Sequence, residues 1–183
     1  MVGKQTHHRF PPLETKRMLL RDLQYGDASF LRSHWSDPDV TEFMIVDPPI
    51  TSIAQAIANV KAFRGRRRSF HRWVLELKET GEAIGTCGFS EWRKRYRRAE
   101  IGFDLTPSQW GKGLMGEALI EILSFGFENL GLHRIFAMTH PANARSIRTL
   151  ESAGFRKEGR LRDYYIDRGV FVDRLVFAML ETD

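Results

Sequence analysis

Cysteine is almost absent from this sequence: Cys87 is the single one among 183 residues. One cysteine excludes an internal disulfide framework and a cysteine-rich metal site, and we expect no metal. No apolar run reaches the roughly 20 residues of a membrane-spanning helix, and the N-terminus lacks the apolar region of a secretion signal. These absences predict a cytoplasmic protein without a membrane partner, in which Cys87 is a small apolar residue of a strand.

The composition is that of an ordinary globular protein, with 42% hydrophobic residues, 28% charged residues and a net charge of +5. The length predicts one domain over residues 1–183, with residues 1–12 as a loose tail. Positive charge gathers in residues 64–68 and 93–98. This balance favours acidic partners, such as a phosphorylated cofactor, RNA or the ribosome, without establishing any of them.

Apolar periodicity predicts both strands and helices. Short apolar or alternating segments predict strands at residues 17–23, 70–77, 83–89, 99–105, 134–139, 155–166 and 170–180. Helical spacing predicts a short helix capped by Asp27, a second helix behind a Ser52–Gln55 capping box, and further helices from Leu114 to Leu130 and after Asn143. The inner face of the second helix is expected to include Ile57. Hairpins at both ends and one β-α-β crossover predict a mixed α+β fold rather than a repeating parallel α/β array.

The most informative stretch lies between the strand at 99–105 and the helix that begins near Leu114. Gly111, Gly113 and Gly116 have the spacing G-x-G-x-x-G there. Glycines let backbone N–H groups approach a phosphate, and the dipole of the following helix adds positive character. The stretch therefore predicts a pyrophosphate-binding loop.

The surroundings of this loop narrow the choice of ligand. A dinucleotide fingerprint should directly follow its strand and be followed by an acidic residue about 20 positions on. Here residues 106–110 intervene, and the next strand ends in Thr139 and His140 without a carboxylate. A Walker A loop is excluded because Gly113 follows Lys112. A glycine-rich helix start without any ligand stays open as an alternative.

Five segments, in order, resemble the GNAT superfamily of N-acetyltransferases, and within it the subgroup that acetylates the N-terminal alanine or serine of ribosomal proteins. The segments are LETKRMLLR at 13–21, AEIGF at 99–103, WGKGLMGEA at 110–118, NARSIRTLESAGF at 143–155, and GRLRD at 159–163 with Asp173. The resemblance covers nearly the whole chain. It implies a mostly antiparallel sheet of about seven strands, splayed between the fourth and fifth, with about four flanking helices and acetyl-CoA as co-substrate.

The same resemblance implies which residues bind acetyl-CoA. A backbone N–H near the end of the fourth strand would bind the thioester oxygen as that oxygen gains negative charge. The implied co-substrate residues are Phe103, Asp104 and Leu105 on that strand, Trp110, Gly111, Lys112, Gly113, Leu114, Met115 and Gly116 in the loop, and Asn143 and Ser146 beside the pantetheine arm.

Two side chains are candidates for proton transfer. An ammonium has no lone pair, so the acceptor needs a base, and Glu100 is the candidate because it lies on the strand face opposite Ile101 and Phe103. A surface or structural carboxylate paired with an arginine such as Arg97 or Arg98 is the alternative for Glu100. The leaving thiolate needs a hydrogen-bond donor. Leu150 stands where many family members have a tyrosine, and Ser146 is the candidate donor, with local backbone capping as its alternative.

The acceptor is left open by the sequence. The subgroup implies a protein N-terminal α-amine, and a polyamine or aminoglycoside is the alternative. A third possibility is a non-enzymatic RNA or ribosome-associated module, since arginines alternate with Trp92 and Tyr96 near residues 93–98. His34 is a second, weaker candidate base, and Tyr164 and Tyr165 are candidates for lining the acceptor cleft.

Overall fold

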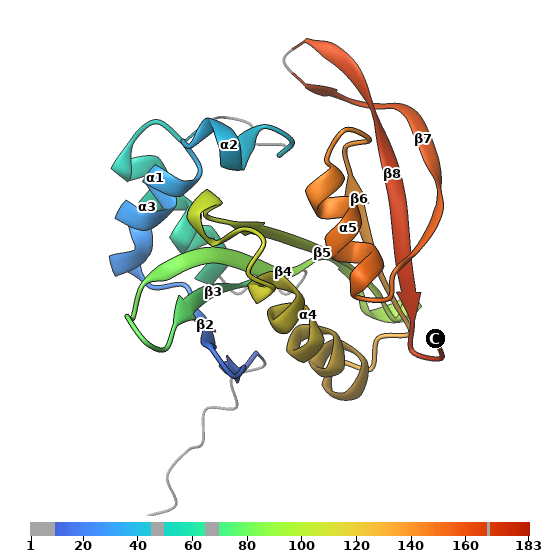
Figure 1. Cartoon of the computed structure of the whole chain (residues 1–183), viewed down its shortest axis with the longest axis horizontal. Coiled ribbons are helices and arrows are strands. Elements are labelled where there is room, and N and C mark those ends of the chain that lie inside the picture. The colour runs from blue at the N-terminus through green and yellow to red at the C-terminus, as the bar shows by residue number, and fades with distance from the viewer. Residues whose placement is uncertain (1–9, 45–49, 65–69, 168) are drawn as a thin grey trace, which may run out of the picture.

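A twisted sheet of eight strands organises the described part of the chain in the computed structural model, which describes residues 10–44, 50–64, 70–167 and 169–183. The strands lie side by side in the order β1-β2-β3-β4-β5-β6-β8-β7 (Figure 1). Their bounds are β1 Leu13–Glu14, β2 Met18–Asp22, β3 His71–Leu77, β4 Ala83–Arg93, β5 Arg98–Leu105, β6 Arg134–Thr139, β7 Arg156–Asp167 and β8 Val170–Leu180.

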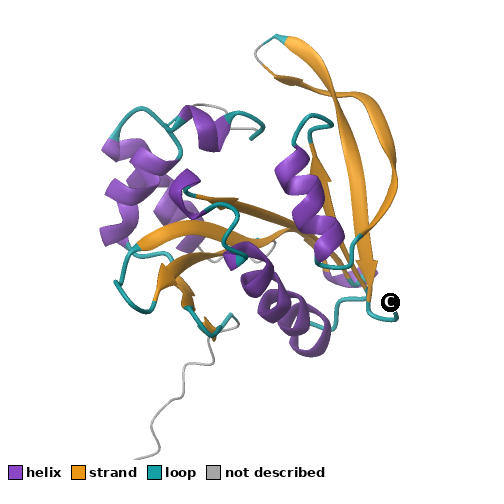
Figure 2. Ribbon diagram, in the orientation of Figure 1, coloured by secondary structure: helices purple, strands orange, loops and turns teal. Residues whose placement is uncertain are grey.

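Helices cover both faces of this sheet (Figure 2). They are α1 Ala28–His34, α2 Pro38–Thr41, α3 Ile53–Arg64, α4 Leu114–Ser124 and α5 Ala144–Ser152. Neighbouring residues of β3 show the two faces, because successive side chains of a strand point in opposite directions. Leu75 belongs to the larger apolar cluster with α4 and α5, whereas Val74 belongs to the smaller cluster with α1 and α3.

The sheet opens between β5 and β6, the only parallel pair among the described strands. Their pairing stops at Glu100 and Phe136. Beyond that point β5 continues to Leu105 along β4, and β6 continues to Thr139 along β8. The predicted splay between the strands at 99–105 and 134–139 is therefore confirmed, and so is the α+β class.

Local signals in the sequence locate most elements correctly. Gln55 N–H donates to Ser52 Oγ at 3.2 Å, and Ser52 N–H donates to Gln55 Oε1 at 3.0 Å, so the predicted capping box forms. The predicted helix 114–130 changes at Phe125 into a π-helical turn. A Cβ on Gly126 would lie 2.8 Å from the Phe89 ring, so this turn packs its backbone against β4.

Three expectations need correction. Asp27 does not cap α1, because its carboxylate accepts hydrogen bonds from Arg21 and from the Gln24 N–H. Ile57 does not face the core and is 42% exposed. The loose tail does not extend to residue 12: Phe10 stacks on His71 with ring centroids 4.2 Å apart. Residues 1–9 lie outside the described part.

Candidate functional site

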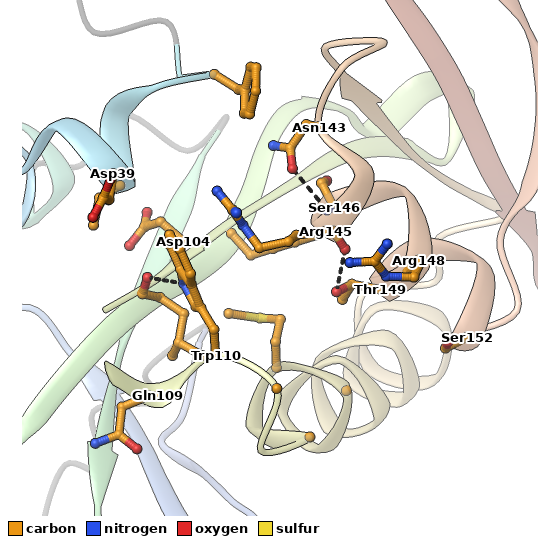
Figure 3. Close-up of a pocket in the computed structure, with 18 of the residues that line it drawn as sticks. Asp39, Asp104, Gln109, Trp110, Asn143, Arg145, Ser146, Arg148, Thr149 and Ser152 are labelled. Atoms are coloured by element: carbon orange, nitrogen blue, oxygen red, sulfur yellow. Dashed lines mark hydrogen bonds between the residues drawn. The ribbon is translucent and has the colours of Figure 1, made fainter. Parts of the chain in front are cut away.

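A cavity of about 380 Å³ lies where β5 and β6 part (Figure 3). It is bordered by the end of β5, the glycine loop, α5 and the segment that contains α2. It brings together ten of the residues expected to bind acetyl-CoA: Phe103, Asp104, Leu105, Trp110, Gly111, Gly113, Met115, Gly116, Asn143 and Ser146. Residues far apart in the chain thus converge on one space, although they were predicted from separate motifs.

The glycine loop has the backbone shape of an anion cradle. Gly111 and Gly113 both have φ of +74°, a conformation that other residues rarely adopt. Gly113 is the N-cap of α4, and no side chain caps the helix there. The first N–H groups of α4 therefore have no intrahelical acceptor. Nothing lies within 4 Å of the position that a Cβ on Gly116 would occupy, so the backbone is open on this side.

Arg17, which directly precedes β2, binds both the glycine loop and the first turn of α4. Arg17 Nε donates to Glu117 Oε2 at 2.7 Å, and Arg17 Nη1 donates to the Lys112 carbonyl oxygen at 3.0 Å. The pair joins the start of β2 to the first turn of α4. No local pattern in the sequence links two residues that are a hundred positions apart, so this contact was not foreseen.

Helix α5 forms the polar wall of the cavity (Figure 3). Asn143 Oδ1 accepts the Ser146 N–H at 3.0 Å, so the predicted N-cap is confirmed. Four further lining residues on this helix were not predicted: Arg145, Arg148, Thr149 and Ser152. Their spacing of three, four and seven residues marks one helix face, and this periodicity could have predicted them.

A cation–π contact spans the cavity between α5 and the loop. The Arg145 guanidinium lies 4.0 Å from the centroid of the Trp110 ring. The Trp110 indole N–H in turn donates to the Leu105 carbonyl oxygen at 2.7 Å, which fixes the ring against the end of β5. Arg145 Nη2 also lies 3.5 Å from Glu42 Oε2. The cavity wall is therefore held together by side chains from three separate segments.

Asp104 carries a buried charge beneath the cavity. Its Oδ1 lies 2.7 Å from His34 Nε2, and its Oδ2 lies 2.5 Å from Arg72 Nη2. Thr86 contributes its backbone N–H at 2.9 Å and its hydroxyl at 2.7 Å. Burial by itself raises the pKa of Asp104, but the Arg72 charge and these hydrogen bonds outweigh it and hold that pKa well below its usual range.

This network changes the interpretation of two predicted residues. His34 was a weaker candidate for the base, and it is instead buried against Asp104 and packed in α1. For Asp104 the resemblance implied only a backbone role, and its side chain proves to join β5 to β3 and α1. This side-chain role was not predicted, because a polar residue on a strand is more often exposed.

Glu100 lies on the same face of β5 as Asp104, at the point where the strands part, but it does not line the cavity. Ser90 Oγ donates to Glu100 Oε2 at 3.3 Å. Burial raises the pKa of Glu100 above its ordinary value. Arg97 and Arg98, the arginines considered as its partners, bind elsewhere: Arg97 contacts Glu181 at 2.6 Å and Arg98 lies over the Phe136 ring.

Two other predicted residues also lie outside the cavity lining. Leu114 is 3% exposed and packs in the core. Lys112 is exposed, and its Nζ donates to Gln109 Oε1 at 3.0 Å. Leu114 can therefore offer a ligand only its backbone N–H, whereas the exposed Lys112 ammonium keeps two further donors. Tyr164 is 50% exposed, whereas Tyr165 lies against a buried arginine, Arg174, at 4.1 Å.

Of the two basic runs, the structure describes residues 93–98 in full and only Arg64 of residues 64–68. Within residues 93–98, Arg93 pairs with Glu91 at 2.8 Å and Arg95 lies over the Tyr96 ring at 5.8 Å. Arg64 donates to the Leu23 carbonyl oxygen at 2.6 Å, and the rest of that run lies outside the described residues. Local acidic partners therefore offset part of the charge of residues 93–98.

The described ranges contain neither a cluster of metal ligands nor a membrane-spanning helix. No three His, Cys, Asp or Glu side chains of these ranges lie together as metal ligands. No helix described here is long and apolar enough to cross a membrane.

Comparison with known proteins decides the family. The family model described as "Acetyltransferase (GNAT) domain" matches residues 17–156. The chain belongs to the GNAT family of acetyltransferases. The curated relative p20 of Bacillus licheniformis, an uncharacterized N-acetyltransferase, is 40% identical over 176 residues, covering 93% of this chain and 97% of p20. The predicted resemblance to this superfamily is therefore confirmed, and the chain is an N-acetyltransferase.

Two further GNAT proteins act on different acceptors. The Escherichia coli K12 enzyme named for alanine N-acetylation of ribosomal protein uS5 is 34% identical over 125 residues, covering 68% of this chain and 64% of that enzyme. A solved mutant of the spermidine N-acetyltransferase SpeG from Vibrio cholerae has a TM-score of 0.77 at 22% identity, covering 91% of this chain and 95% of SpeG. The GNAT fold is thus shared by enzymes for a protein and for a polyamine.

Proposed function

We propose that this N-acetyltransferase moves the acetyl group of acetyl-CoA to the N-terminal α-amine of a protein or peptide, in the cytoplasm. The observation that carries the proposal is the cavity at the splay of β5 and β6, which joins an uncapped helix N-terminus to the end of β5, the strand that also carries Glu100. The relative that acetylates alanine of a ribosomal protein supports this choice of acceptor. A ribosomal or other acidic partner at residues 93–98 is part of the same proposal.

The described residues fit acetyl-CoA in three respects. The unpaired N–H groups at the start of α4 suit the pyrophosphate. Arg145 and Arg148 add positive charge on the facing wall. Phe103 and Leu105 give an apolar wall near the backbone N–H groups at the end of β5, which suits a thioester whose oxygen needs a donor.

The reaction moves protons at the amine and at the sulfur. The acceptor ammonium gives a proton to Glu100, directly or through water, and its free amine then attacks the thioester carbon. As the carbon–sulfur bond breaks, the nitrogen, now bound to the carbonyl carbon, gives up its second proton to solvent. The leaving thiolate accepts a hydrogen bond from the Ser146 hydroxyl and takes up a proton to become the free thiol. In this scheme Glu100 needs to be ionised, and its raised pKa makes it a stronger base than an exposed glutamate.

Replacing Glu100 by glutamine tests the base. General-base removal typically costs about 100-fold or more, so kcat should fall by about that factor while acetyl-CoA affinity stays unchanged. In the wild type the rate should fall as the pH drops through the raised pKa of Glu100, and this acid limb should vanish in the variant. Glu79→Gln, which removes an exposed carboxylate from the turn between β3 and β4, is the control. An unchanged pH–rate profile in Glu100→Gln would remove Glu100 from the mechanism.

Replacing Ser146 by alanine tests the thiolate donor. One hydroxyl hydrogen bond made mainly in the transition state is worth about 1 kcal/mol, so kcat should fall by about 5- to 10-fold with little change in the KM for acetyl-CoA. Ser124→Ala removes an exposed hydroxyl from the end of α4, outside the cavity lining, and should retain full turnover. Equal kcat values for Ser146→Ala and wild type in single-turnover measurements would show that Ser146 has no role in departure of the thiolate.

A further inference from the structure

Arg174 of β8 is a buried arginine on the same sheet face as the proposed base. Glu100 pairs with Phe136, and Phe136 pairs with Ala178, so these three residues share one face. Residues two and four positions apart on a strand point the same way, which places Arg174 on that face as well. Arg174 is only 4% exposed.

The contacts of Arg174 are few for a buried cation. Its guanidinium lies 4.1 Å from the centroid of the Tyr165 ring, and Nη1 donates to the Phe43 carbonyl oxygen at 3.5 Å, the outer limit of a hydrogen bond. No carboxylate of the described residues lies within 4.0 Å of it. Burial lowers the pKa of Arg174 to about 10, and the charge of Glu100 opposes that shift.

The other arginines that lie well inside the sheet are fully partnered. Arg72 donates to Asp104 and to Thr86. Arg21 pairs with both Asp27 and Glu76. Burying a guanidinium without such partners is costly, because the five N–H donors lose water and gain little in return. Among the described residues Arg174 is therefore the exception, and its donors that have no partner there suit a partner that is supplied by a substrate.

The position of Arg174 indicates which part of the substrate would accept a hydrogen bond from it. Phe43, which accepts its one hydrogen bond, forms part of the cavity wall, and Glu100 is the charged group that acts on Arg174 electrostatically. We propose that Arg174 is a specificity-determining residue that donates to a peptide carbonyl oxygen near the acceptor α-amine, while Glu100 receives the proton from that amine. This inference rests on the proposed transfer to an N-terminal amine.

The same arrangement disfavours a polyamine. Spermidine has no carbonyl oxygen to accept from Arg174, and its further ammonium groups would approach a fixed positive charge. A peptide N-terminus supplies one ammonium and a carbonyl oxygen beside it. Arg174 therefore selects by attraction to one acceptor class and by repulsion of the other.

Arg174→Gln is the test, with acetyl-CoA and a lysine-free peptide amide that begins with alanine. The KM for the peptide should rise about 10- to 100-fold, the loss expected for a hydrogen bond to a charged donor, while acetyl-CoA affinity is unchanged. Arg174→Lys should restore part of the loss. Arg162→Gln, which removes an exposed arginine from β7, should behave as wild type.

A pH profile separates this role from a merely structural one. Glu100 is faced by Ser90 and Glu91 from β4, Arg72 from β3 and Arg174 from β8. Because the Arg174 charge lowers the pKa of Glu100, its removal should move the acid limb of kcat/KM to higher pH. An unchanged peptide KM and an unmoved limb in Arg174→Gln would overturn the inference.

A wild-type measurement keeps the inference testable if Arg174→Gln does not fold. Alanine amide should be acetylated with a kcat/KM at least about 10-fold above that of isopropylamine, which lacks the carbonyl group. Equal rates for the two amines would overturn the role of Arg174 while leaving peptide acetylation intact. Faster turnover of spermidine than of the alanine peptide would instead contradict the proposed function itself.

Discussion

Leucine in place of Gly116 is expected to abolish measurable acetyl-CoA binding while leaving the fold intact. A Cβ at this position meets nothing within 4 Å, so the larger side chain extends into the cavity rather than into protein. Leucine also suits the first turn of α4 better than glycine does, by as much as about 1 kcal/mol. Binding and stability should thus change in opposite directions, with the Kd rising at least about 100-fold.

Titration calorimetry with acetyl-CoA and thermal unfolding measure these two effects. Gly159→Leu is the matched control: Gly159 lies in β7, its Cβ position is also open, and it is far from the loop in sequence and outside the cavity lining. The control should bind acetyl-CoA as the wild type does. If Gly116→Leu kept wild-type affinity, the loop would not be the pyrophosphate site.

Asparagine in place of Asp104 should lower the free energy of unfolding more than any other substitution proposed for this protein. The substitution removes the negative charge that faces Arg72 at 2.5 Å and His34 at 2.7 Å, and leaves a largely buried guanidinium without its counter-charge. Breaking a buried pair by removing one partner costs about 3–5 kcal/mol. For a domain of this length such a loss lowers Tm by about 10 °C.

The pH dependence shows whether charge causes this loss. The folded-state pKa of Asp104 is depressed, so its contribution is complete above the unfolded value of about 3.9 and is lost as the pH falls below it. The stability gap between wild type and Asp104→Asn should therefore narrow below about pH 4. Asp22→Asn is the control, since Asp22 is 44% exposed and its neighbour His71 is neutral at pH 7, because burial lowers the pKa of His71 to about 4. Equal Tm values for Asp104→Asn and Asp22→Asn would contradict the account of the network.

Signals that act over a few residues were sufficient to predict most of the fold. The Ser52–Gln55 box, the Asn143 cap and the spacing of Gly111, Gly113 and Gly116 each depend on backbone groups within one helical turn. Strand periodicity located seven strands, and the structure adds the two-residue β1. The splay followed from the family resemblance, and the end of pairing at Glu100 confirms it.

Contacts between segments that are far apart in the chain could not be predicted from such local signals. The partners of Asp104 come from α1, β3 and β4, and no local pattern in the sequence links any of them to Asp104. Arg174 carries no local pattern at all, because its burial depends on Phe43 and Tyr165 from other elements. Such residues become visible only when the sheet order is known.

The most direct test of the central claim is an acceptor assay at saturating acetyl-CoA. Free thiol and peptide mass are followed with a lysine-free peptide that begins with alanine, with the same peptide acetylated at its N-terminus, and with spermidine. The account predicts one acetyl group on each free N-terminus, thiol release in equal amount, no reaction of the blocked peptide and slower reaction of spermidine. Absence of acetylation on the free peptide, or equal thiol release with the blocked one, would contradict it.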